Sequence, residues 1–189
     1  MTQLVELSPL EAEMERLRLL DLRRTAYHEA GHAVVGIALG VSPLWVTMGK
    51  REHADALGET KFSRLFHILE PEKNTEQSVL RVLAIDVAGY LAETKLCNDL
   101  GELIDDAIAR GARKDMRKID IVFRNRNALL NSNLLDDRDA VMAEVIPATE
   151  RLLVENWGRV STIAAMLLRF EKLSQSQVEA AFAAGEVPA

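Results

Sequence analysis

The segment from His28 to Leu39 reads HEAGHAVVGIAL, so titratable side chains lead directly into an apolar run. In a helix, residues four apart share one face, and the rings of His28 and His32 can therefore reach the same cation. Glu29 is rotated off that line by about a third of a turn, so its carboxylate can act on water without ligating the ion. This division of labour is that of the H-E-x-x-H zinc peptidases.

The alternative is a chance match, in which both histidines are ordinary, partly buried helix residues. Two local features argue against it. Gly31 lies inside the predicted helix, where glycine costs about 1 kcal/mol relative to alanine, which indicates that another group approaches the backbone closely. The following residues, Ala33 to Leu39, are apolar on nearly every face. Imidazoles and a carboxylate in such surroundings need partners, and a Zn²⁺ ion would supply them. We therefore expect a zinc site.

Composition limits the class of protein. The chain has 189 residues, 48% hydrophobic and 28% charged, with a net charge of −6, as in an ordinary globular protein. Its basic residues are dispersed, so we expect no binding to nucleic acid or to an anionic membrane surface. One local basic cluster is interrupted by acidic residues, and we interpret it as a solvated helix face. It consists of Arg110, Arg113, Lys114, Arg117 and Lys118.

Neither a membrane span nor a targeting signal is evident. The apolar run from Ala33 to Val41 is about half of the ~20 residues that a bilayer requires. The N-terminal region is rich in glutamate, unlike a secretory signal or a transit peptide. The lone Cys97, interpreted as buried, fits a reducing compartment, and we expect a cytoplasmic protein. No G-x-x-x-x-G-K-[ST] phosphate-binding loop is present, so ATP hydrolysis by that route is not expected.

The sequence predicts a mainly α fold with a small β-sheet or hairpin beside the motif helix. Ser8 with Glu11 predicts a capping box at the start of a helix that we expect to run to about Arg24, and Thr25 is expected to cap a second helix ending at Gly40. Ser174 with Gln177 predicts another capping box. Residues 44–48 and 57–62 are predicted to pair as antiparallel edge strands. Further helices are expected at about 75–97, 113–130, 137–156, 160–170 and 175–184. We expect one domain over residues 1–189, comprising an N-terminal helix (1–24), a metal-site half (25–130) and C-terminal helices (131–189).

A catalytic zinc needs a third protein ligand. His53 and His67 lie in or beside a polar loop and are expected at the surface, so a carboxylate must complete the site. Asp115 is attractive because we expect it in the first turn of a helix just after a glycine, and Glu93 on another helix is the close alternative. Spacing alone does not decide between them. The other carboxylates considered are Glu59, Asp86 and Asp120.

At this point the chain resembles a known family, the FtsH-type ATP-dependent zinc metalloproteases. Residues 26–36 resemble the family's motif region, and residues 46–48 with 56–62 its substrate-side edge strand. Residues 82–93 are similar to its central glycine-containing helix, and residues 111–115 to the segment whose aspartate completes the zinc site. The resemblance extends from about Ala26 to Phe182 and concerns the peptidase domain; no ATPase module or membrane helices are recognisable in the sequence.

The resemblance implies that His28, His32 and Asp115 ligate Zn²⁺, that Glu29 is the catalytic base, and that Glu93 supports the ligands. Some residues depart from the family pattern, among them Lys114, Tyr90 and Thr94, which puts the family's hexameric assembly and the shape of its substrate groove in question. We expect a zinc metalloendopeptidase that cuts flexible or unfolded polypeptides, with a separate ATPase or unfoldase as a candidate partner and a homo-oligomer as an open alternative. The rival is a non-hydrolytic binding or regulatory module that retains the fold and the metal site.

Overall fold

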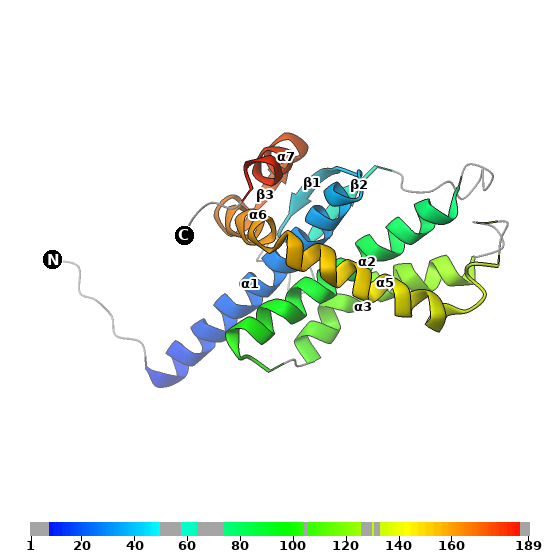
Figure 1. Ribbon diagram of the computed structural model, residues 1–189. Coiled ribbons are helices and arrows are strands. Elements are labelled where there is room, and N and C mark those ends of the chain that lie inside the picture. The colour runs from blue at the N-terminus through cyan, green and yellow to red at the C-terminus, as the bar shows by residue number, and fades with distance from the viewer. Residues whose placement is uncertain are drawn as a thin grey trace.

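The computed structural model describes residues 8–49, 58–63, 74–103, 106–125, 130 and 133–185. The described part is mainly helical with one small sheet, as the sequence predicts (Figure 1). Its helices are α1 (Pro9–Ala38), α2 (Glu76–Leu100), α3 (Asp106–Arg124), α5 (Arg138–Glu155), α6 (Trp157–Phe170) and α7 (Gln175–Ala184). Its strands are β1 (Pro43–Thr47), β2 (Glu59–Phe62) and β3 (Lys172–Ser174).

Helix α1 is one continuous helix of 30 residues, so the predicted break at Thr25 is wrong. Thr25 does not cap a second helix, because its hydroxyl donates back to the carbonyl of Asp21 at 3.0 Å, one turn earlier in the same helix. The predicted capping box at Ser8 is confirmed: Ser8 accepts from the Glu11 amide, and the Glu11 carboxylate accepts from the Ser8 amide. The helix ends at Ala38, close to the predicted stop at Gly40.

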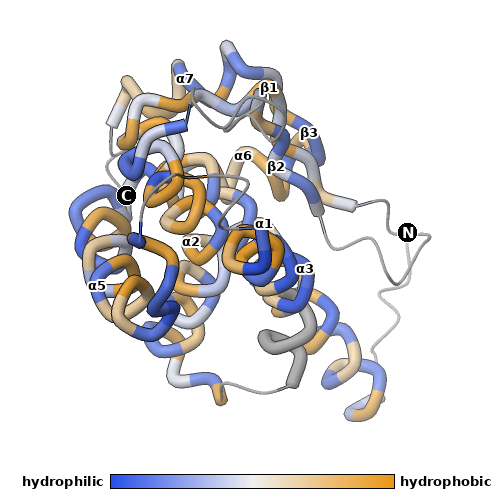
Figure 2. The backbone as a smooth tube through the Cα atoms, turned by 90° about the vertical axis from the view of Figure 1, so that its right-hand side faces the viewer, coloured by the Kyte–Doolittle hydropathy of each residue, from blue (hydrophilic) through white to orange (hydrophobic). Residues whose placement is uncertain are grey.

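The second half of α1 forms the centre of the molecule. It packs against α2 and α6 and carries buried residues continuously from His28 to Gly36. Gly31 faces α2 at such short range that a Cβ there would lie 2.6 Å from Ala92 Cβ and 2.8 Å from the carbonyl oxygen of Ala88. Small residues on both helices thus allow the two backbones to approach closely. Figure 2 shows hydrophobic and hydrophilic residues alternating along the helices, the pattern expected for helices around a shared core.

The sheet has the strand order β2-β1-β3, with both pairs antiparallel. The predicted pairing of the first two strands is confirmed, but of these two only β2 is an edge strand, because β3 pairs with the other side of β1. A strand as short as Lys172–Ser174 between two helices leaves no alternating pattern to recognise, and it was not predicted. Helix α7 follows it directly and contacts β1, with the predicted Ser174–Gln177 capping box in place (Figure 1).

Helix α3 differs from its prediction at both ends. It begins at Asp106, earlier than the expected start near Arg113, and ends at Arg124, before the expected end at Leu130. Gly111 lies within the helix, because one glycine costs only about 1 kcal/mol and does not stop a helix that tertiary packing stabilises. In the described ranges, no helix combines the length and apolarity that crossing a bilayer demands.

Candidate metal centre

Three side chains from two distant parts of the sequence converge at the buried half of α1. The Nε2 atoms of His28 and His32 lie 3.1 Å apart. Asp115 Oδ2, from α3, lies 2.9 Å from the His28 nitrogen and 3.1 Å from the His32 nitrogen. All three residues are buried, and they are the one group of potential metal ligands found among the described residues. The structure thus brings together the three residues that the sequence and the resemblance singled out.

This triangle of two nitrogens and one oxygen has nearly the dimensions of one face of a zinc tetrahedron. Zinc–nitrogen and zinc–oxygen bonds of about 2.0–2.1 Å imply ligand–ligand distances of about 3.3 Å. The observed distances of 2.9–3.1 Å therefore need to open by only a few tenths of an ångström to hold the ion. Three candidate protein ligands are the number that catalytic zinc sites use, whereas structural zinc sites usually have four.

The outer nitrogens of both rings are held by acceptors. His32 Nδ1 donates to the carbonyl oxygen of Ile85 at 2.6 Å, and His28 Nδ1 lies 3.3 Å from Glu93 Oε2. When each Nδ1 carries the proton, each Nε2 presents a lone pair toward Asp115, which is itself an acceptor. Three acceptors facing one point require a cation between them. Such outer hydrogen bonds are the usual support of metal-binding histidines.

The pKa values of His28 and Asp115 are both shifted in the direction that favours positive charge in the cluster. Burial opposes protonation of His28, but its hydrogen bonds with Asp115 and Glu93 and the charge of Glu29 raise its pKa to about 10. Burial disfavours the charged form of Asp115 as well, yet the charge of His32 and hydrogen bonds from both imidazoles leave its pKa below the usual range. Both shifts have the same physical cause, which is that the buried carboxylates favour positive charge beside them.

Asp115 is held in place from its own helix. It lies near the middle of α3, so the expectation that it occupies a first turn is wrong, yet its carboxylate lies against both imidazoles. Lys118, one turn later, donates to Asp115 Oδ1 at 2.7 Å, which leaves Oδ2 for the imidazoles. Lys118 also lies 3.7 Å from Asp86 Oδ1. Burial raises the pKa of Asp86 to about 6, against the opposing charge of Lys118.

The contact of Lys118 with Asp115 does not follow from the sequence pattern, which favours a solvated helix face for this lysine. The side chain is 45% exposed, yet its ammonium group contacts a buried carboxylate. The available signal was its spacing of three residues from Asp115, which places both on one face of a helix.

Glu29 is fixed by β2, which runs alongside the start of the motif. The hydroxyl of Thr60 donates to Glu29 Oε2 at 2.7 Å and also lies 3.0 Å from the Glu29 carbonyl oxygen. At Gly58 the backbone φ is +147°, and a Cβ would lie 2.7 Å from Glu29 Oε1. A side chain at position 58 would therefore displace the carboxylate. Thr60 and Gly58 are positioning residues that the sequence analysis did not identify as such.

A second glycine leaves room for the two rings. A Cβ on Gly89, in α2, would lie 2.5 Å from His32 Nε2 and 2.6 Å from His28 Nε2. These are the atoms that face Asp115, so only glycine at this position leaves both nitrogens unobstructed. The predicted helix around Gly89 is present, but the contact that makes this glycine necessary is a tertiary one.

The remaining ligand candidates lie apart from the triangle. Glu93 is buried and lies near the outer nitrogen of His28, next to the ligands as the resemblance implied. Asp86 lies near Lys118, whose ammonium group also contacts Asp115. Asp120 pairs with Arg138 at 2.6 Å, joining α3 to α5. Glu59 begins β2 without joining the cluster. His53 and His67 lie outside the described residues.

These features define a class of site: two histidines one turn apart, a carboxylate from a distant helix and a glutamate beside the first histidine. The comparisons with known proteins agree with that class. A protein named ATP-dependent zinc metalloprotease FtsH 1, from Symbiobacterium thermophilum, is 30% identical over 179 residues, which cover 87% of this chain and 30% of that protein. Two proteins of Phytoplasma mali, named ATP-dependent zinc metalloproteases FtsH 3 and FtsH 1, are each 27% identical over 180 residues.

The chain is thus a distant relative of the FtsH-type zinc metalloproteases. The likeness to the two Phytoplasma mali proteins covers 84% of this chain and 27% of each of them. The chain spans 30% or less of the length of these relatives. No family model matches the chain.

Proposed function

We propose that this protein is a zinc-dependent endopeptidase that hydrolyses peptide bonds in flexible or unfolded polypeptides and does not itself hydrolyse ATP. The observation that carries the proposal is the acceptor triangle of His28, His32 and Asp115, with edges of 2.9–3.1 Å, beside a separately held Glu29. The distant likeness to zinc metalloproteases supports it. The three triangle residues would hold Zn²⁺.

Zinc bound there would supply Lewis-acid chemistry, because the ion polarises a carbonyl oxygen and lowers the pKa of water to near 7. Glu29 takes the proton from the attacking water and returns it to the leaving amine. Thr60 keeps the Glu29 carboxylate in one orientation through its 2.7 Å hydrogen bond. Lys118 keeps Asp115 directed at the imidazoles. Gly89 provides the space in which both rings meet the ion.

Strand β2 is one of the two edge strands of the sheet and lies next to Glu29, so it can align an extended peptide by main-chain hydrogen bonds. Recognition of this kind reads the backbone more than the side chains, and we expect loose sequence preference. A folded protein does not present such a strand. Efficient cleavage of folded substrates would therefore require a separate ATPase or unfoldase as partner.

A non-hydrolytic binding module is the rival function. A purely structural zinc site is a weaker rival, because such sites are usually closed by four protein ligands, and the cluster among the described residues has three. Neither rival requires a glutamate positioned by Thr60 and Gly58. The test measures zinc content and the digestion of unfolded casein by the wild-type chain and by Glu29→Gln.

We expect one zinc ion per chain in both forms, with cleavage by the wild type and a loss of about a thousandfold or more in Glu29→Gln. Glu11→Gln, a change of the same kind on the exposed end of α1, is the matched control and should retain full activity. Full zinc occupancy without wild-type cleavage would favour the binding module. Equal cleavage by wild type and Glu29→Gln would exclude Glu29 as the base.

A further inference from the structure

The first half of α1 carries an apolar face that the metal centre does not use. Leu10, Met14 and Leu17 follow one another at spacings of four and three residues, so they share one side of the helix. Leu10 is 71% exposed, Met14 62% and Leu17 47%. We call these three side chains the α1 stripe. It precedes the region that resembles the metalloprotease family, so that resemblance does not explain it.

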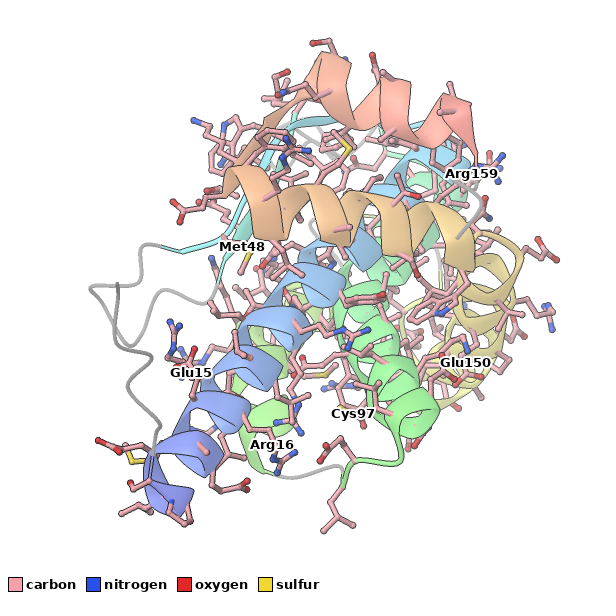
Figure 3. All side chains as sticks on the ribbon, turned by 90° about the vertical axis from the view of Figure 1, so that its left-hand side faces the viewer. Glu15, Arg16, Met48, Cys97, Glu150 and Arg159 are labelled. Atoms are coloured by element: carbon pink, nitrogen blue, oxygen red, sulfur yellow. The ribbon has the colours of Figure 1, made fainter. Side chains whose placement is uncertain are left out.

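The α1 stripe lies on a part of the helix that extends from the body of the molecule. Figure 1 shows the first turns of α1 leading away from the other helices, and Figure 3 labels Glu15 and Arg16 on the next turn. Arg16 there pairs with Glu102, just beyond α2, at 2.9 Å. Burial of leucine and methionine side chains against a partner favours association. A row of three such residues on a projecting helix is the geometry of a helix–helix interface.

The charges beside the stripe identify the partner. Glu11 follows Leu10 and Arg18 follows Leu17, so the two residues lie along the same edge of the stripe, seven residues apart and at its opposite ends. In an antiparallel pair of identical helices centred on Met14, the N-terminal end of the stripe on one copy lies beside the C-terminal end of the stripe on the other. Glu11 of each copy then faces Arg18 of the other, and the same ion pair forms twice. An interface that satisfies itself in this way is isologous, as in twofold-symmetric dimers.

The charged groups remain accessible for such pairing. Arg18 is bound to Glu15 in its own helix at 2.8 Å, with its side chain 52% exposed, so it can bridge to a further carboxylate. Glu11 contacts Ser8 through Oε2. Both residues lie outside the body of the molecule. We propose that two copies of this chain associate through the α1 stripe, with their α1 helices antiparallel and Met14 at the twofold axis.

The first test measures the mass of the full chain by sedimentation equilibrium over a range of micromolar concentrations. We expect a reversible monomer–dimer equilibrium. Met14→Glu should weaken it by about tenfold or more, because it places two carboxylates at the apolar centre. Leu19→Glu is the matched control, since Leu19 is 53% exposed on the opposite side of α1 and should leave the dissociation constant unchanged. A wild-type chain that stays monomeric throughout this range would overturn the proposal.

The second test examines the charge pairing. Arg18→Glu should weaken the dimer severalfold, whereas Arg23→Glu, which makes the same change in net charge on another side of the helix, should not. Equal effects of the two changes would show that only net charge matters and would remove the argument for a second copy as partner.

The third test examines orientation by disulfide formation. Cys97 is buried and is the sole cysteine of the chain, so the parent protein is a suitable blank. Met14→Cys should form a disulfide-linked dimer under mild oxidation, because position 14 meets itself across the axis. Leu10→Cys should not, because in an antiparallel pair the two copies of position 10 lie at opposite ends. Rapid cross-linking through position 10 would overturn the antiparallel arrangement. These readouts are independent of zinc and of proteolysis.

Discussion

The two halves of α1 have the same backbone geometry but depend on different interactions. From Pro9 to about Arg23 the helix is mostly exposed, and its side chains pair within one turn, as Glu13 does with Arg16 and Glu15 with Arg18. From Arg24 onward the helix is buried against α2 and α6, and two glycines, Gly31 and Gly36, replace side chains. The first half is stabilised mainly by local contacts, with one long-range ion pair between Arg16 and Glu102 at 2.9 Å. The second half is stabilised by packing that only the folded chain provides.

This difference between the halves explains why the candidate metal ligands of α1 lie in its buried half. Exposed charged pairs contribute little to stability and tolerate change, typically 0–1 kcal/mol per pair. The buried half positions each ring by contacts from another element: Ile85 and Glu93 on the outer nitrogens and Asp115 on the inner ones. Precise positioning of the histidines therefore depends on the packed half, whereas the exposed half can change without reaching the site.

The largest effect should come from filling the contact between α1 and α2. Gly31→Val introduces atoms within 2.6 Å of Ala92 Cβ and 2.8 Å of the Ala88 carbonyl, and we expect it to lower the free energy of unfolding by about 3 kcal/mol. Ala12→Val makes a β-branched change in the exposed half and should cost less than about 0.7 kcal/mol. Urea unfolding followed by circular dichroism measures both. Equal losses would contradict the distinction between the halves.

A change at Gly89 should damage the site more than the fold. In Gly89→Ala the new methyl group lies within 2.6 Å of both Nε2 atoms and forces the rings apart. We expect zinc affinity, measured by competition with a chromophoric chelator, to fall by about a hundredfold or more. The helical circular dichroism signal should be retained. Unchanged zinc affinity in the folded variant would mean that the rings reach the ion from another direction.

The hydrogen bond from Lys118 should have a smaller influence on zinc binding. Lys118→Met leaves Asp115 without the donor that fixes Oδ1, and we expect about tenfold weaker zinc binding, with partial rescue in Lys118→Arg. Lys114→Met removes an exposed charge one turn earlier on α3 and is the matched control. Tighter zinc binding by Lys118→Met would show that charge repulsion between lysine and the ion outweighs the positioning of Asp115.

The smallest effect should follow removal of the cap on the exposed half. Ser8→Ala removes the side chain that accepts from the Glu11 amide, a change that costs about 1 kcal/mol in helix stability. We expect faster amide hydrogen exchange in the first turns of α1 and unchanged exchange from Arg24 onward. Zinc affinity should stay the same. A change in zinc affinity would show that the two halves are coupled more strongly than their contacts indicate.

Much of this architecture follows from local sequence patterns. The capping boxes at Ser8 and Ser174 locate helix starts, and the apolar periodicity after Thr75 predicts α2 to within a few residues. The continuity of α1 through Thr25 could not be predicted in the same way. A threonine that caps a new helix and a threonine that bonds back to the previous turn look alike in a sequence, and the choice depends on surrounding packing.

For the site, the sequence by itself determined that His28 and His32 share a helix face with Glu29 beside them, because helical spacing is a local property. It could not decide between Asp115 and Glu93, since both are acidic residues on predicted helices far along the chain. What the tertiary structure decided is where the two carboxylates lie: Asp115 contacts the inner nitrogens of both rings, and Glu93 the outer nitrogen of His28, an arrangement that favours Asp115 as the ligand. The requirement for glycine at position 89 likewise arises only in the folded protein, because the atoms that leave no room for a side chain are those of His28 and His32 on another helix.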